Sequence, residues 1–478
     1  GNIANAIKDC LRCGKCKPVC STHVPEANLL YSPRNKILST SLLIEALLYE
    51  EQTRRGVSLT HWGEFEDVSD HCSICHRCEK PCPVDIDFGK VSIKMRNLLR
   101  AQKKRSFNPG KLAVLAFLSV KEPSLLRPLR AIMRWSYTLQ RMAHSFASKS
   151  PLVRRQLRTP PATVGRAPLK GQIIHLINRP MPAGLPSRSS RALLDLEDSA
   201  TIPVIRDPAK TNIETAAVFY FPGCGSERLF SQVGLATQAM LYHLGVQTVL
   251  PPGYLCCGYP QTAAGNEDKG QSIATENRVL FHRVANTLNY LDIKTVIVSC
   301  GTCMDQLQEY EFDKIFPGCR VLDIHEYLLE KGVRLDGTGD ANYLFHDPCH
   351  TPMKQIPALE VANGLLGVPL ALSERCCGES GTMAVTRPDV STQVRFRKQA
   401  EIEKNVAALR AAHPDGRPTR ILTACPSCLQ GLARYANIAG GVESDYLVVE
   451  LARRLLGKNW LEDYVNSANR GGIERVLL

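Results

Sequence analysis

Cysteine is the residue type in this sequence that offers the most chemistry. The chain of 478 residues contains 19 cysteines, far more than packing requires. Four thiolates at a spacing of C-x2-C-x2-C-x3-C are the ligands of a [4Fe–4S] cluster, and where two such runs occur, the fourth cysteine of each binds the other cluster. Two runs with this spacing predict two cubane clusters, one bound by Cys10, Cys13, Cys16 and Cys82, the other by Cys72, Cys75, Cys78 and Cys20.

Two zinc knuckles are the alternative interpretation of these eight cysteines. Zinc sites usually take their cysteines in two separated pairs, whereas the cysteines here come in evenly spaced runs. Prolines at positions 81 and 83 also flank Cys82, as the cluster-binding pattern expects. The spacing therefore favours iron–sulfur clusters over zinc.

Ten further cysteines form two sets of five with one common layout. Each set spans 79 positions from its first cysteine to its last, and the sets are offset by 125 positions at both ends, so the sequence contains an internal duplication. The first set is Cys224, Cys256, Cys257, Cys300 and Cys303; the second is Cys349, Cys376, Cys377, Cys425 and Cys428.

The surroundings of the two sets predict parallel α/β units. Short apolar runs at residues 216–221 and 342–345 precede the first cysteine of each set, and similar runs at 295–299 and 420–424 precede the final pair. Sites in such units lie where the strands end. Five thiolates are one more than a cubane cluster or a tetrahedral zinc ion needs, which indicates a larger or irregular metal group.

These motifs carry a resemblance to known iron–sulfur proteins. The 51 residues between the two runs, with a predicted helix at 35–51, resemble the helical ferredoxin domain of succinate dehydrogenase and of heterodisulfide reductase. The duplicated C-C-G sets resemble the cysteine-rich domain of heterodisulfide reductase, of anaerobic glycerol-3-phosphate dehydrogenase, and of the iron–sulfur part of FAD-linked 2-hydroxyacid dehydrogenases of the glycolate and D-lactate type. This resemblance implies non-cubane [4Fe–4S] clusters on one or both five-cysteine sets, with zinc in one of them as the alternative.

The net charge of +13 is concentrated in one segment. Residues 100–194 contain 19 Lys and Arg against one acidic residue, Glu122, so the rest of the chain is close to neutral. Within this segment we expect a helix at 124–146 with Arg127, Arg130, Arg134 and Arg141 on one face and apolar residues on the other. Two roles are possible for this part of the chain: the apolar face packs on the protein itself, or residues 112–146 contact an anionic membrane. Nucleic acid is not the expected partner.

The expected fold class is α plus α/β, in four parts. We predict a helical two-cluster ferredoxin domain at 1–105, a basic and proline-rich linker at 106–214, and two cysteine-rich domains at 215–338 and 339–478. Residues 151–208, with nine prolines, are expected to be an extended crossing segment. A cytoplasmic location is expected, with peripheral attachment to the inner membrane as a further possibility.

Two single residues receive predictions of their own. His350 adjoins Cys349, so it is a candidate to orient or hydrogen-bond a cluster sulfur, whereas no such neighbour marks His325 or His346. Cys319 lies outside every set and is expected to be a buried apolar thiol.

The expected function is electron transfer within an oxidoreductase. The segment around Gly223 lacks the third glycine of a dinucleotide loop, so FAD is expected on a partner protein or an upstream domain. Clusters would then pass electrons from that flavin to quinone or another acceptor. Reduction of a heterodisulfide or thiol substrate at the cysteine-rich repeats is the alternative, and a non-catalytic metal-stabilised scaffold is a third class.

Overall fold

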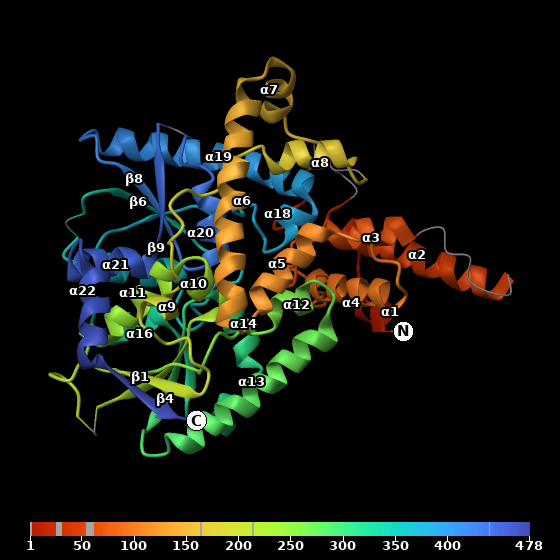
Figure 1. The fold of residues 1–478 in the computed structure, drawn as a ribbon. Helices are drawn as coiled ribbons and strands as arrows, with labels where there is room; N and C mark the ends of the chain where they lie inside the picture. Colours follow the sequence, from red (N-terminus) through yellow and green to blue (C-terminus); the bar gives the residue numbers. More distant parts are fainter. Residues whose placement is uncertain are drawn as a thin grey trace.

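The computed structural model describes residues 2–24, 31–53, 62–162, 165–212, 215–337, 339–438 and 440–478. Figure 1 shows a helical N-terminal part on one side of the molecule and two sheets with their helices on the other. The N-terminal part consists of α1 (Asn2–Ile7), α2 (Pro33–Thr53), α3 (Trp62–Asp70) and α4 (Phe88–Ala101). The predicted helix at 35–51 is confirmed, since it lies within α2.

A small apolar core organises these four helices. On α4, Val91, Met95 and Leu99 recur every four residues and are almost completely buried, so one face of the helix points inward. Ile37 of α2 and Phe65 of α3 pack against that face, together with cysteines of both runs. The core therefore fixes where the two cysteine runs lie relative to each other.

The basic segment is helical for much of its length. It contains α5 (Pro109–Ser119), α6 (Pro123–Lys149), α7 (Pro151–Arg158), α8 (Leu169–Leu176) and α9 (Ser190–Leu193). The expectation of an extended chain over 151–208 was wrong, because Pro151 occupies the first turn of α7 and Pro168 precedes α8, where the missing N–H of proline costs nothing. Within the part of the chain that the structure describes, no helix is long and apolar enough to cross a membrane.

The first sheet has six strands in the order β10-β1-β3-β2-β4-β5. Strands β2, β3, β4 and β5 are parallel, and β1 pairs antiparallel with both β3 and β10. The strands are β1 (Thr201–Ile205), β2 (Ala217–Phe221), β3 (Gln247–Val249), β4 (Ile293–Val298), β5 (Arg320–Asp323) and β10 (Ile473–Leu477). The accompanying helices are α10 (Gly223–Arg228), α11 (Ser231–His243), α12 (Tyr259–Ala263), α13 (Glu267–Thr287), α14 (Gly301–Gln308), α15 (Phe312–Ile315) and α16 (Ile324–Glu330).

The second sheet is parallel throughout, with the order β7-β6-β8-β9. Its strands are β6 (Asn342–His346), β7 (Ala371–Leu372), β8 (Thr419–Thr423) and β9 (Val442–Tyr446). Its helices are α17 (Ala358–Leu366), α18 (Met383–Thr386), α19 (Pro388–Ala412), α20 (Pro426–Ala433), α21 (Leu447–Leu456) and α22 (Trp460–Ser467), followed by a short π-helical turn, η1 (Ala468–Gly472).

The duplication is visible in the positions of the elements. Strand β6 lies 125 positions after β2, and α20 lies 125 positions after α14. The mixture of helices with parallel and mixed sheets agrees with the expected α plus α/β class, while the domain boundaries stay predictions. One apolar core contains Val233 and Met240 of α11 together with Leu365 and Leu447 of the second repeat. The two repeats therefore pack as one body.

Candidate metal centres

Cys10, Cys13, Cys16 and Cys82 line one pocket at the surface of the helical part. The pocket encloses about 400 Å³, part of it open to solvent, and Pro83, Ile86 and Phe88 complete its wall. These are the four cysteines that the spacing groups into the first cluster. The structure places them together, and their role as ligands stays a prediction.

The two cysteine runs share the same backbone turn. Arg12 and Gly14 in the first run and Ile74 and His76 in the second all have positive φ angles, at matching positions relative to the cysteines. Successive turns of this kind aim backbone N–H groups into the loop, and in the second run the N–H of Ile74 donates to the Cys72 sulfur at 3.4 Å. Three of these four residues are not glycine, so the conformation is imposed by the surroundings.

Cys20 lies beside the second run. Burial raises the pKa of the Cys75 thiol, and the neighbouring Cys20 and Cys72 raise it further. Burial likewise raises the pKa of Cys78, with Cys72 next in effect. Ser21 and Ser73 also hydrogen-bond across the two runs at 3.0 Å. The fourth cysteine of the first run is thus close to the thiols with which the spacing pairs it.

The first cysteine-rich repeat gathers five buried thiols at the carboxyl ends of β2, β3 and β4. The thiols shift one another's pKa in one chain of neighbours: Cys224 with Cys256, Cys256 with Cys257, Cys257 with Cys303 and Cys303 with Cys300. Gly223, with φ of +75°, precedes Cys224, and a side chain there would lie 2.7 Å from the sulfur of Cys303. Only glycine leaves room for the sulfurs to meet at this position.

The second repeat gathers its thiols in the same way. Cys376 and Cys377 shift each other's pKa, as do Cys377 and Cys428, and Cys428 and Cys425. Burial, followed by the charges of Cys75 and Cys377, raises the pKa of Cys349 to about 12. In both repeats the glycine of the C-C-G motif, Gly258 or Gly378, has a positive φ. Glycine adopts this conformation without strain, which explains why glycine follows the paired cysteines.

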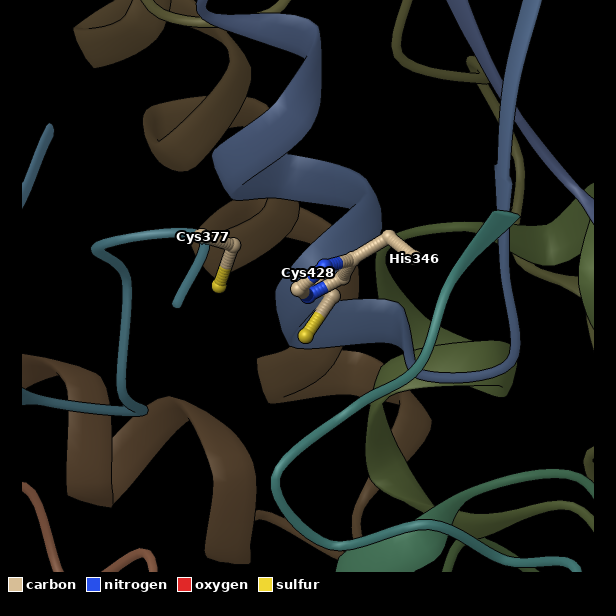
Figure 2. Close-up of side chains that lie close together, drawn as sticks. All are labelled: His346, Cys377 and Cys428. Carbon is tan, nitrogen blue, oxygen red and sulfur yellow. The ribbon is translucent and has the colours of Figure 1, made fainter. Parts of the chain in front are cut away.

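Three residues at these sites were missed by the sequence analysis. The hydroxyl of Tyr310 donates to the carbonyl of Cys257 at 2.9 Å, and Tyr435, 125 positions later, donates to the carbonyl of Cys377 at 3.2 Å. His346 lies with Cys377 and Cys428, their ligand atoms all within 4.8 Å of one another (Figure 2). The two tyrosines could have been found from the sequence, because they are separated by the same 125 positions as the cysteine sets. His346 could not be found in this way, because the first repeat has phenylalanine at the equivalent position.

His350 joins three parts of the chain. Its Nδ1 pairs with Asp305 Oδ2 of α14 at 2.5 Å, and its Nε2 lies 2.8 Å from the carbonyl of Ile74 in the second cysteine run. The rings of His76 and Tyr259 meet it edge-on. Both ring nitrogens thus have oxygen partners, which positions the loop of Cys349 against the helical part. Contact of this ring with a cofactor stays a prediction.

Neighbouring cysteine groups contact one another across the whole molecule. Arg77 of the second run lies among Cys349, Cys75 and Cys376. Burial alone would lower its pKa, but the charges of these three sulfurs and of Asp347 together raise it. Between the repeats, Cys300 and Cys425 are close enough to shift each other's pKa. The spatial order is therefore first run, second run, second repeat, first repeat, which differs from the order in the sequence.

The donor set fits soft metal groups. Four thiols surround the first pocket, and nine of the ten thiols in the repeats are buried. Buried thiolates at such distances repel one another unless a cation lies between them. All nineteen cysteines are in the described ranges and none forms a disulfide. Thiolate sites of this kind select iron–sulfur clusters or zinc.

Comparison with known proteins agrees with this chemistry. A model described as a 4Fe-4S dicluster domain matches residues 6–86, and one described as a cysteine-rich domain matches residues 218–308 and 343–433. Residues 433–478 match a domain of unknown function, DUF3400. No solved structure matches the chain at a significant level.

Several curated proteins are similar over long stretches. The probable glycolate oxidase iron-sulfur subunit of Bacillus subtilis is 23% identical over 445 residues, 88% of this chain and 87% of that protein. The glycolate oxidase iron-sulfur subunit of Escherichia coli is 23% identical over 89% of this chain and 90% of its own length. One component of the fumarate reductase (CoM/CoB) of Methanothermobacter marburgensis is 26% identical over 44% of this chain and 40% of its own length. The chain is thus a homologue of glycolate oxidase iron–sulfur subunits, an oxidoreductase component that joins a 4Fe-4S dicluster domain to two copies of the cysteine-rich domain.

Proposed function

We propose that the protein carries single electrons from a flavin, bound to a partner protein or an upstream domain, to a quinone or a similar acceptor. The observation that carries this proposal is the continuous line of cysteine groups, in which Cys20 lies beside Cys75, Cys75 beside Cys349, and Cys425 against Cys300. Iron–sulfur clusters, when bound, are one-electron carriers whose potentials depend on burial and hydrogen bonding. The names of the two glycolate oxidase subunits support a 2-hydroxyacid-oxidising flavoprotein as the partner.

The proposed ligand sets follow the groups that the fold brings together. The two ferredoxin-type sets would hold cubane [4Fe–4S] clusters, and each five-cysteine set would hold a further, non-cubane cluster. Zinc in one of the repeats is the alternative, because any four thiolates of a set satisfy it. His350 would position Cys349 through its bonds to Asp305 and Ile74.

Burial favours this relay over thiol or disulfide reduction at the repeats. A disulfide substrate must reach a sulfur or a metal directly, yet nine of the ten repeat cysteines are buried. Electrons need no such access, because they pass between buried centres that are close to one another. The arrangement of the repeats therefore suits transfer of electrons better than binding of a thiol substrate.

The test uses the protein assembled with its flavoprotein partner. After addition of glycolate or D-lactate, we expect the flavin absorbance to bleach first, the cluster absorbance to fall next, and a soluble quinone to restore both in stopped-flow measurements. Analysis of iron and acid-labile sulfide should give about 16 iron atoms per chain if all four sites hold four-iron clusters. Protein without iron, or clusters that stay oxidised while the flavin is reduced, would contradict the proposal.

Contact with a membrane is a further part of this proposal, and it rests on an unexpected orientation of α6. Arg130 is 5% exposed and donates to the carbonyls of Pro186 and Arg188, while Arg141 donates to that of Pro182. Arg130 and Arg141 of the predicted stripe therefore face the protein, whereas Arg127 and Arg134 are exposed. The opposite face presents large apolar side chains to solvent: Leu125, Ile132, Trp135, Leu139, Met142 and Phe146.

An anionic lipid surface fits this apolar face of α6. In Figure 1 the helix runs across the front of the molecule, with α7 at its end. Trp135 is 66% and Phe146 81% exposed, and exposed basic residues follow at Lys149, Arg155 and Arg158. Aromatic side chains on one face with cations beside them are typical of helices that lie in the membrane interface. The attraction of each such cation to anionic lipid is worth about 1 kcal/mol.

We expect the double variant Trp135→Ser, Phe146→Ser to bind anionic vesicles at least about tenfold more weakly, since each large apolar side chain contributes roughly 1.5–3 kcal/mol when fully buried. Flotation with phosphatidylglycerol vesicles measures the binding, and salt should weaken it for the wild-type protein. Val279→Ser, an exposed position on α13, is the matched control. If the double variant binds vesicles as the wild type does but loses the flavoprotein partner, the face is a protein–protein interface instead.

A further inference from the structure

The two cysteine-rich repeats differ at one buried position. His346 ends β6 and Phe221 ends β2, 125 positions earlier, and each side chain is 1% exposed. Phe221 packs against the ring of Phe281 in an apolar core. The second repeat therefore has an imidazole where the first has a hydrocarbon ring, although the strands that carry them are equivalent.

The imidazole lies among the thiols of its repeat. Figure 2 shows His346 at the end of its strand, Cys377 on the loop of the C-C-G motif and Cys428 on α20, gathered at one place. The ligand atoms of all three lie within 4.8 Å of one another, and all three residues are buried. A nitrogen and two sulfurs at such distances can share one metal ion after small movements of the side chains.

The hydrogen bonds behind the ring decide which nitrogen is free for a metal. His346 Nδ1 lies 3.0 Å from the carbonyl oxygen of Ser373 and 3.2 Å from Lys398 Nζ. The ammonium of Lys398 has three shorter contacts for its three hydrogens: Ser373 Oγ at 2.6 Å, Glu401 Oε2 at 2.8 Å and the Ser373 carbonyl at 3.1 Å.

The Ser373 carbonyl has a second lone pair, so it can accept the hydrogen of Nδ1 while Lys398 keeps its three shorter contacts. A neutral imidazole with its hydrogen on Nδ1 keeps a lone pair on Nε2. Metal-binding histidines are typically held in this way, with the other ring N–H donated to a backbone carbonyl.

We propose that His346 is a nitrogen ligand of the metal group in the second repeat. The second site is then a mixed nitrogen and sulfur site, whereas the first site, with Phe221, is bound by sulfur alone. This inference rests on the proposed metal binding by the repeats. The reduction potential of an iron–sulfur cluster depends on its ligands and their surroundings, so the two duplicated sites should differ in potential.

The test is pulsed EPR of the reduced protein labelled with ¹⁵N-histidine, prepared with its partner and full metal content. We expect a strong ¹⁵N-histidine coupling in the wild type and its loss in His346→Phe, which copies the first repeat. The control is His350→Asn, which removes the histidine that follows Cys349 in the same repeat and should leave the coupling in place. A redox titration should also show a changed potential for the second site in His346→Phe.

The variant His346→Cys covers the case in which His346→Phe does not fold. It offers a sulfur ligand at the same place, so we expect full iron content without the histidine coupling. Persistence of the coupling in His346→Cys, or its absence from fully loaded wild-type protein, overturns the inference while leaving the electron-transfer proposal intact.

Metal analysis separates the remaining outcomes. If the second site contains zinc, X-ray absorption at the zinc edge should show one nitrogen among sulfurs, and this nitrogen should disappear in His346→Cys. That result supports ligation by His346 and removes one cluster from the proposed relay. A wild-type protein with no metal at the second repeat overturns both proposals.

Discussion

Replacing Cys377 or Cys257 by alanine should each stop delivery of electrons to quinone while leaving reduction of the flavin by the hydroxyacid intact. Carriers in series fail when one of them is lost, and the two repeats touch through Cys300 and Cys425. Mutation of a residue that only hydrogen-bonds to a metal ligand typically lowers metal affinity or activity about 10- to 100-fold. Loss of a thiolate ligand itself should therefore lower the rate of quinone reduction at least about 100-fold. Stopped-flow absorbance of the flavin, followed beside quinone reduction, measures the two steps separately.

Cys319→Ala is the matched control for these variants. Cys319 packs against the apolar core of the first repeat, burial raises its pKa to about 11, and it lies outside both five-cysteine sets. We expect this variant to keep the wild-type rate. Full quinone reduction in both Cys377→Ala and Cys257→Ala would mean that the repeats are structural metal sites. Failure of Cys377→Ala alone would place the relay in the second repeat, whose Cys349 lies beside Cys75 of the second run.

Cys20→Ser should remove the cluster of the second run and spare that of the first, although Cys20 belongs to the first run in the sequence. The reason is position: Cys20 lies beside Cys75, while Cys82 lines the pocket of Cys10, Cys13 and Cys16. The loss should be about four iron atoms per chain, the content of one cubane cluster. EPR spectra of the reduced variants, compared with iron analysis, distinguish the two clusters.

Cys82→Ser is the reciprocal variant, and it should remove the cluster in the surface pocket instead. Because metal binding and folding are coupled, both variants should also be less stable than the wild type, with unfolding at lower temperature. A Cys20→Ser protein with an intact second-run cluster would contradict the crossed pairing. Equal loss of both clusters in both variants would indicate collapse of the helical part and call for measurement in the assembled complex.

Local elements of the fold could be predicted well from the sequence. The helix at 35–51, the strands before each cysteine set and the 125-position repeat are all found, because periodicity and spacing act over short distances along the chain. The prediction of an extended chain at residues 151–208 was wrong because it rested on the number of prolines. Proline is compatible with the first turn of a helix, and composition does not show where in a helix a proline lies. Pairing of β1 with β10 joins residues about 270 positions apart and had no local signal.

Helix α6 illustrates what periodicity leaves undecided. The sequence showed two faces, one of arginines and one of apolar residues, but burial depends on what each face meets. The carbonyls of Pro182, Pro186 and Arg188 accept hydrogen bonds from Arg130 and Arg141 and so allow these two side chains to lie against the protein. Arg127 and Arg134 on the same face stay exposed. The apolar face has no comparable cover among the described residues, as its large exposed side chains show.

The sequence by itself determined the chemistry of this protein: eighteen cysteines in four groups, a duplication, and the absence of a third glycine from the segment around Gly223. Tertiary structure alone decided the spatial order of those groups, the approach of His346 to Cys377 and Cys428, and the location of His350 between Asp305 and Ile74. The physical reason is the range of the forces involved. Ligand spacing is set by the few backbone angles between neighbouring cysteines, whereas contacts between distant segments depend on how whole helices and sheets pack.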